Sequence, residues 1–162
     1  MKLSWIIRHF VRVFKHKAYL FHTGRKFGVS YYRIIVHDLS KFSLTEVRHY
    51  SRQFFAPDEE KNWDEFRKGW HHHVMHNPHH WEYWILSGRS EEKPIEMPEK
   101  FAREMVADWM AASKAYTGSW DLQQWLCDNW IKIKLHPNTR EFVLELLKSS
   151  GYRWWLFPKV KE

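Results

Sequence analysis

The adjacent residues His37 and Asp38 combine two side chains that can bind one metal ion from the end of a helix. A neutral imidazole nitrogen and a hard carboxylate oxygen both suit divalent transition metals. A single His-Asp dipeptide is weak evidence, because the same pair also forms the polar end of many ordinary helices. The interpretation therefore depends on the other residues that the chain offers.

Histidine is unusually frequent, with 12 in 162 residues, and several of these residues fall close together. His22 lies fifteen residues before His37, and pairs and triplets of histidine follow downstream. Asp108 stands in an otherwise apolar helix face, where a metal ion would offset the cost of burying its carboxylate. Helical bundles build metal sites from side chains on facing helices. We therefore predict a metal centre formed by His22, His37, Asp38, His73, His79, His80 and Asp108.

Not every histidine in this pattern can face one site. Residues 71–73 point in three directions on a helix, so at most two of them reach the core. His72 and His76, four residues apart, form an alternative pair. Either His79 or His80 could orient a water molecule instead of binding metal. The other histidines outside the predicted centre are expected on the surface or in the core: His9, His16, His49 and His136.

Part of this pattern resembles a known family. Four residues resemble the four-ligand signature of the HD superfamily of metal-dependent phosphohydrolases: His22, His37, Asp38 and Asp108. The further ligands of its multi-metal members are similar to His73, His79 and His80. The resemblance implies an all-α fold, an HD-like helical bundle around two metal ions.

The stretch from His37 to Lys41 is also similar to the HD-x-G-K motif of the cyclic-dinucleotide phosphodiesterases and of the di-iron inositol oxygenase. Ser40 stands where those families have glycine. Their lysine contacts a phosphate or a hydroxyl of the substrate, so the resemblance implies the same role for Lys41. The sequence lacks the GYP motif of the phosphodiesterases, which argues against a cyclic dinucleotide as the substrate.

A closer resemblance, over about residues 20–145, is to a small family of uncharacterised bacterial and phage proteins. Its pattern is HD-x-SK, a glutamate after four further residues, a tyrosine and then H-x(5)-HH-x-E. The matching residues here are His37, Asp38, Ser40, Lys41, Glu46, Tyr50, His73, His79, His80 and Glu82. Within this pattern Glu82 is expected to hold a histidine ligand from behind. Glu46 is expected to pair with Lys41 or Arg48.

These features predict an enzyme that uses two divalent transition metals to hydrolyse a nucleotide or another phosphate ester. Such ions lower the pKa of bound water and hold the oxygens of an in-line displacement. Manganese or iron is the expected metal, with magnesium, cobalt, nickel or zinc as alternatives. Asp38 and Lys41 are the expected catalytic residues. Lys41 and Lys114 are expected to contact the anionic substrate.

Two other functions stay open. The same ligands with iron could activate dioxygen, as the resemblance to inositol oxygenase implies. A non-catalytic module that binds nucleic acid or protein is the other, since aromatic residues interleaved with Lys and Arg can stack bases. Most tryptophans fall at the spacing of helix cores, which favours packing over base stacking: Trp63, Trp70, Trp109 and Trp125.

Residues 1–162 are expected to form one domain in which helices position these side chains. The predicted helices cover 3–16, 17–27, 30–37, 43–55, 59–76, 79–86, 98–118, 119–133 and 138–147. Ser30 and Ser43 are the expected N-caps, although the β-branched run 30–37 could also be a strand. Residues 87–98 are expected as a surface loop. The basic amphipathic segment 1–16 and the aromatic tail 152–162 could join copies of the chain.

The amino-acid composition indicates which classes of binding partner to expect. Lys and Arg number 26 against 19 Asp and Glu, and this excess favours nucleotides, phosphates, nucleic acid or a membrane surface. An aromatic content of 18% excludes a disordered chain. The single cysteine, Cys127, cannot form an internal disulfide, and Arg8 interrupts the apolar N-terminus too early for a signal peptide. We therefore expect a cytoplasmic protein without a membrane span.

Overall fold

Helices dominate the structure, a computed structural model that describes residues 2–87 and 92–158. The α-helices are α1 (Leu3–Lys26), α2 (Tyr31–Val36), α3 (Leu44–Phe55), α4 (Trp63–His76), α5 (Glu99–Thr117), α6 (Gln123–Asn129) and α7 (Pro137–Ser149). The 3-10 helices are η1 (Leu39–Phe42), η2 (Asp58–Glu60), η3 (Trp81–Trp84), η4 (Trp130–Lys132) and η5 (Trp154–Leu156). Two short strands, β1 (Ile85–Ser87) and β2 (Glu92–Pro94), pair antiparallel. The all-α class predicted from the sequence is confirmed.

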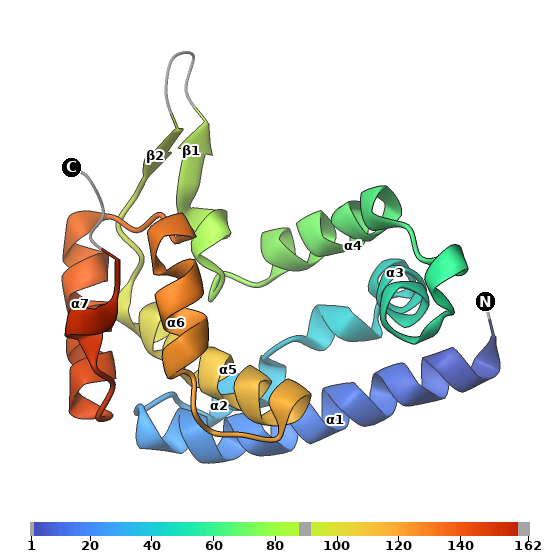
Figure 1. The fold of residues 1–162 in the computed structure, drawn as a ribbon, viewed down its shortest axis with the longest axis horizontal. Coiled ribbons are helices and arrows are strands. Elements are labelled where there is room, and N and C mark those ends of the chain that lie inside the picture. The colour runs from blue at the N-terminus through green and yellow to red at the C-terminus, as the bar shows by residue number, and fades with distance from the viewer. Residues whose placement is uncertain (1, 88–91, 159–162) are drawn as a thin grey trace.

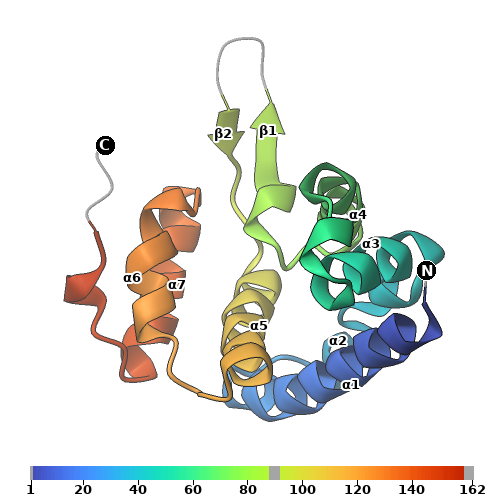
Figure 2. The ribbon, with the colours of Figure 1, turned by 45° about the vertical axis from the view of Figure 1, so that its right-hand side comes forward.

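The long helix α1 forms the base on which other helices pack (Figure 1). Near its N-terminus α1 contacts α3, which packs in turn against α4. Towards its C-terminus α1 contacts α2 and α5, and α7 covers another side of α5 (Figure 2). Helices α1, α4 and α5 therefore surround the turn between α2 and α3.

The main hydrophobic core lies around α5. A hydrogen bond fixes the close approach of α5 to α1, because Thr23 Oγ1 donates to the carbonyl of Ala107 at 2.8 Å. Fully buried apolar side chains from several helices fill this core: Leu20, Ala102, Met105, Val106, Leu126, Val143 and Leu147. Such packing holds α1 and α5 at one register, and both helices carry candidate metal ligands.

Several predicted helix ends are confirmed. The Ser30 hydroxyl accepts the backbone N–H of Arg33, so the β-branched run after it forms α2 and not a strand. The Ser43 hydroxyl accepts the N–H of Glu46 at 3.3 Å and begins α3. Gly118 ends α5 with φ 79°. Local capping chemistry thus sets these boundaries.

Other boundaries differ from the prediction. Helices predicted at 3–16 and 17–27 form one continuous helix, because no proline interrupts the segment and Gly24 stays helical. The first glycine with a positive φ, 71°, is Gly28. The segment 79–86 forms η3 and β1, and β2 follows within the predicted loop, of which residues 88–91 lie outside the described part. Three-residue strands are too short to show a period. Helix α6 begins at Gln123, four residues later than predicted, because Ser119 Oγ accepts the N–H of Asp121 in a turn.

The C-terminal tail is docked in part. Phe157 is buried and its ring centroid lies 5.1 Å from that of Trp130, whereas Trp154 and Trp155 stay exposed. Within the described ranges, no helix has both the length and the apolar character required to cross a membrane.

Candidate metal centre

The turn after α2 brings two adjacent side chains to the interior. Asp38 adopts a left-handed conformation with φ 58° and ψ 23°, which among non-glycine residues Asp tolerates comparatively well. The Lys17 ammonium holds the turn in place, donating to the carbonyls of Ile35 at 3.0 Å and His37 at 2.7 Å. His37 and Asp38 are both only 1% exposed, so both functional groups lie inside the bundle.

One group of candidate ligands joins α1, this turn and α5. His16 Nε2 lies 3.0 Å from Asp108 Oδ1 and 3.3 Å from His37 Nε2. His37 Nε2 lies 3.3 Å from Asp38 Oδ2 and 3.4 Å from Asp108 Oδ1. One ligand atom from each of these four residues falls within 4.8 Å of the others. This spacing suits a single metal ion.

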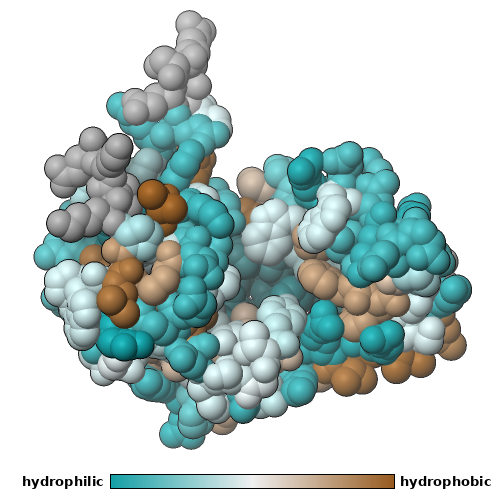
Figure 3. Space-filling view, in the orientation of Figure 1, coloured by the Kyte–Doolittle hydropathy of each residue, from teal (hydrophilic) through white to brown (hydrophobic). Residues whose placement is uncertain are grey.

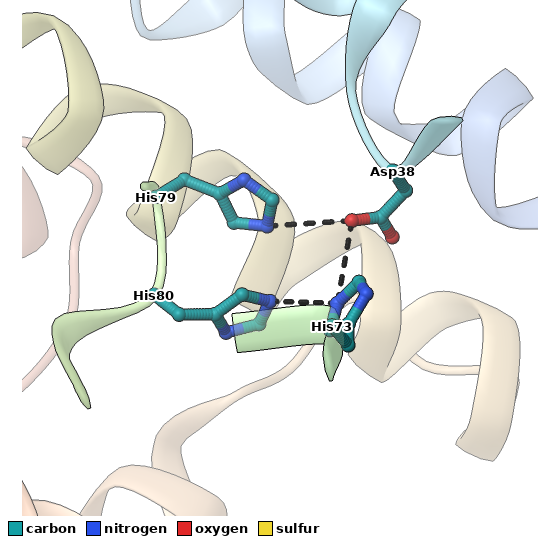
Figure 4. A group of neighbouring side chains, drawn as sticks. All are labelled: Asp38, His73, His79 and His80. Carbon is teal, nitrogen blue, oxygen red and sulfur yellow. Dashed lines mark hydrogen bonds and ion pairs between the residues drawn. The ribbon is translucent and has the colours of Figure 1, made fainter. Parts of the chain in front are cut away.

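A second group shares Asp38 and adds three histidines from α4 and the segment after it (Figure 4). Asp38 Oδ1 lies 3.5 Å from His73 Nε2 and 3.5 Å from His79 Nε2. His80 Nε2 lies 2.8 Å from His73 Nε2. Because Asp38 belongs to both groups, its two oxygens can serve two neighbouring ions.

Two buried glutamates lie behind the histidines. The Nδ1 of His37 donates to Glu104 Oε1 at 2.9 Å, and His79 turns its Nδ1 toward the same oxygen at 3.4 Å. The Nδ1 of His73 donates to Glu46 Oε2 at 2.9 Å. These carboxylates fix the ring orientations and direct the Nε2 atoms at the cluster. Arg33 forms an ion pair with Glu104.

Three residues of the cluster have the protonation state that metal binding needs, whereas His37 would have to lose a proton. Burial alone would lower the pKa of His37, but Asp38 and Asp108 outweigh that effect and hold it well above its ordinary value. Burial and the neighbouring imidazoles hold the pKa of His79 well below its ordinary value, and burial lowers the pKa of His80 to about 3. Both rings are therefore neutral near pH 7. Burial alone would raise the pKa of Asp38, but His37 and Lys41 outweigh that effect and hold it well below the usual range. Asp38 is thus an ionised carboxylate.

Two buried atoms in the cluster lack a hydrogen-bond partner and face each other. With the proton of neutral His79 on Nδ1, which faces Glu104 Oε1, its Nε2 is an acceptor like Asp38 Oδ1, and the two atoms lie 3.5 Å apart. A buried polar atom left unpaired costs about 1–3 kcal/mol. A bound cation would satisfy both atoms at once, so the residues present fit a metal ion.

A cavity of about 340 Å³ opens beside the cluster. Figure 3 shows the surface hollowed near the centre of this face. Four candidate ligands, His16, His73, His80 and Asp108, line the cavity together with Lys41. The walls are mainly aromatic: Tyr50, Phe54, Phe66, Trp70, Trp81, Trp109, Tyr116 and Trp125. A planar apolar group could pack there while an anionic group reaches the ligands.

Residues 6–149 match one protein family, described as Family of unknown function (DUF5662). The chain belongs to this family. No curated protein and no solved structure matches the chain. All candidate ligands lie within the DUF5662 match.

Six of the seven ligands predicted from the sequence lie in the two groups: His37, Asp38, His73, His79, His80 and Asp108. The seventh, His22, must be corrected. It is exposed, and its ring centroid lies 5.4 Å from that of Trp120. The candidate ligand on α1 in this DUF5662 chain is His16 instead, because His16 lies on the buried face of the helix. His22, six residues on, is turned by about 240° around the helix.

The remaining predicted roles change as well. Lys114 is not among the residues lining the cavity; its Nζ donates to the carbonyl of Gly118 at 2.6 Å, at the end of its own helix. Glu82 has no hydrogen bond to a histidine within the described chain; it lines the cavity, and burial raises its pKa. Glu46 contacts His72 and His73, not Lys41 or Arg48.

Lys41 does reach the site. Its Nζ lies 2.6 Å from Asp38 Oδ2, and this carboxylate raises the lysine pKa well above its ordinary value despite burial. Of the alternative pair, His72 bonds to Glu46 at 2.8 Å and stacks on His76 outside both ligand groups. His73 is therefore the member of the triplet that faces the interior.

Sequence reasoning missed His16 and Glu104. The buried residues of α1 recur every three or four positions, and His16 belongs to this stripe: Trp5, His9, Val13, His16, Leu20 and Thr23. That period could have identified His16. Glu104 lies four residues before Asp108 on the same helix, and that spacing could have identified it as a second acid on the inward face.

Proposed function

We propose that the chain is a metal-dependent phosphohydrolase that acts on a nucleotide or another phosphate ester. The observation that carries this proposal is the position of Asp38 in two adjacent groups of candidate ligands, beside a cavity that Lys41 enters. Two-metal sites of this kind commonly serve hydrolysis of phosphate esters. The order of His16, His37-Asp38 and Asp108 along the chain keeps the resemblance to the HD superfamily.

Each of the two ligand groups would bind one metal ion. One ion would be held by His16, His37, Asp38 and Asp108, and the other by Asp38, His73, His79 and His80. When bound, divalent ions supply Lewis acidity for the phosphoryl group and lower the pKa of the attacking water. Imidazole and carboxylate ligands suit manganese or iron best, while magnesium, cobalt, nickel and zinc are alternatives.

Residues of the cavity would bind and orient the substrate. Lys41 carries a positive charge at the cluster and would neutralise a phosphate oxygen. The aromatic walls would stack a planar base. Glu82 keeps its proton more readily than a surface carboxyl, because burial raises its pKa. It is the residue on this wall that could donate a proton to the leaving oxygen.

The test measures metal content and phosphate release in parallel. Protein purified without chelators should contain metal by elemental analysis and should release phosphate from one member of a nucleotide and phosphate-ester panel with Mn²⁺. His16→Ala and Asp108→Ala should each lower kcat/KM by at least about 100-fold. His22→Ala, on the exposed side of α1, is the matched control and should retain both metal and activity.

A protein that takes up no metal even after reconstitution would exclude the proposal. Equal activity of the His16→Ala and His22→Ala variants would exclude the assigned ligands.

One observation favours a second candidate, a di-iron oxygenase of a small molecule. Lys41 is the single Lys or Arg among the described residues that line the cavity, whereas eight of them are aromatic. A weakly charged organic substrate fits such walls as well as a nucleotide does. Oxygen uptake by the iron-loaded protein, without phosphate release from any ester, would decide for this candidate.

A further inference from the structure

Helix α1 exposes an apolar stripe on its outward face. Five large side chains at helical spacing are between 47% and 70% exposed: Leu3, Ile7, Val11, Phe14 and Phe21. The buried face of the same helix contains two histidines, His9 and His16. A helix with large aliphatic and aromatic side chains on its exposed face and histidines on its buried face indicates that the exposed face binds another apolar surface.

The stripe continues onto the neighbouring elements. The Phe42 ring of η1 lies 5.6 Å from Phe10 and 5.6 Å from Phe14 on α1. The ring centroid of Tyr31 on α2 lies 6.1 Å from that of Phe21. Other apolar residues of α2 and η1 are exposed as well: Tyr32, Ile35 and Leu39. We call the exposed apolar side chains of α1, α2 and η1 the outer apolar surface. Figure 3 shows hydrophobic residues along the edge where α1 lies.

The segment that carries this surface is rich in basic residues. Residues 2–45 contain nine Lys and Arg residues, and their single acidic residue, Asp38, is buried in the metal centre. Residues 46–162 contain 17 basic and 18 acidic residues. The whole positive excess of the chain therefore lies in the segment that carries the outer apolar surface. Arg8, Lys15 and Arg25 are exposed on α1 itself.

We propose that the outer apolar surface docks on an anionic lipid membrane, with α1 lying in the plane of the headgroups. Helices with Phe and aliphatic residues on one face and flanking Lys and Arg bind membranes in this way. Anionic lipids attract each basic residue near the surface. A second copy of the chain would bring like charges together. Nucleic acid would match the charge but would not bury Ile7, Val11 or Phe14.

The test is flotation of the purified full-length protein with vesicles. Phosphatidylcholine vesicles containing phosphatidylglycerol should bind the protein, and pure phosphatidylcholine vesicles should bind it at least about tenfold more weakly. The double variant Val11→Glu, Phe14→Glu should lose at least about tenfold in partitioning, because it removes apolar area and adds negative charge. The matched control Leu86→Glu, Ile131→Glu changes two residues that are equally exposed elsewhere, and it should bind as the parent does. Circular dichroism checks that all variants are folded.

Three results would overturn the proposal. The first is failure to float with anionic vesicles at low salt. The second is equal loss of binding in the control variant. The third is a different contact through Val11 and Phe14 in the absence of vesicle binding. Such a contact would appear as a dimer in light scattering or as binding to duplex DNA, and the double variant would abolish either one. The metal centre takes no part in these readouts, so they are independent of the proposed activity.

Discussion

At the scale of single residues, two buried glutamates orient the histidines of the candidate centre. Glu104 accepts a hydrogen bond from His37 Nδ1, and Arg33 forms an ion pair with the same carboxylate. A carboxylate behind a histidine fixes the ring and makes the facing nitrogen more basic. Glu46 does the same for His73 from another helix. The candidate centre is therefore oriented from outside its own ligands.

Replacing Glu104 by Gln is expected to weaken metal binding by about 10- to 100-fold. The amide keeps the shape but loses the negative charge behind His37 and leaves Arg33 without its ion-pair partner. Competition titration with a metal-binding dye measures the affinity. Glu99→Gln, on the exposed first turn of the same helix, is the control and should bind metal like the parent. Equal affinity of both variants would contradict the orienting role of Glu104.

The low pKa of His80 predicts how the metal-free protein responds to acid. His80 stays neutral in the folded state down to about pH 3 but is charged below about pH 6.5 when the chain unfolds. Between these values the unfolded state binds the additional proton, so the free energy of unfolding falls as the pH falls.

The variant His80→Gln should reduce the slope of the free energy of unfolding against pH by up to about 1.4 kcal/mol per pH unit. Urea denaturation of chelator-treated protein between about pH 4.5 and 6 measures this slope. An unchanged slope in His80→Gln would show that His80 is not neutral in the folded protein.

At the scale of elements, the turn between α2 and η1 carries the centre. Its left-handed residue, Asp38, allows the chain to reverse so that His37 and Asp38 both face inward. Lys17 on α1 secures the turn through two backbone carbonyls. The ligand geometry therefore depends on a backbone conformation that most residues disfavour.

Asp38→Asn and Asp38→Ala separate this backbone role from the carboxylate. Both variants should lose metal, because both lack the anionic ligand. Without metal, Asp38→Ala should be less stable than Asp38→Asn by about 1–2 kcal/mol, since Asn tolerates the left-handed conformation and Ala does not. Chemical denaturation of the two metal-free proteins measures the difference. Equal stability would show that the conformation at residue 38 is not strained.

At the scale of the whole molecule, the candidate ligands tie separate helices together. They come from α1, the turn after α2, α4 with the segment after it, and α5. The main hydrophobic core lies mostly on the α5, α6 and α7 side, whereas the α3 and α4 side meets it across the cluster. A metal ion bound there would join the two parts of the fold.

Metal removal should therefore destabilise the entire protein. A metal present at about 100 times its Kd stabilises the folded state by about 2.7 kcal/mol if the unfolded chain does not bind it. Thermal unfolding before and after chelator treatment measures this difference. His16→Ala should show a clearly smaller change on chelation than the parent or His22→Ala. The same Tm with and without chelator in the parent protein would argue against a structural contribution of metal.

The sequence by itself determined the helical class, the helix ends at Ser30, Ser43 and Gly118, and the position of Asp108 on the inward face of one helix. These features depend on local capping and on the periodicity of one helix, which are readable without tertiary contacts. The small β hairpin escaped prediction because its three-residue strands have almost no local pattern.

Only the tertiary structure decided which side chains meet. The choice between His16 and His22 depends on the face that α1 turns toward α5, and that face is fixed by packing against other helices. The role of Glu104 depends on contact with His37, which is 67 residues away along the chain. A charged residue in a helix looks like surface until another element covers it, because burial is a property of the assembled fold and not of the segment.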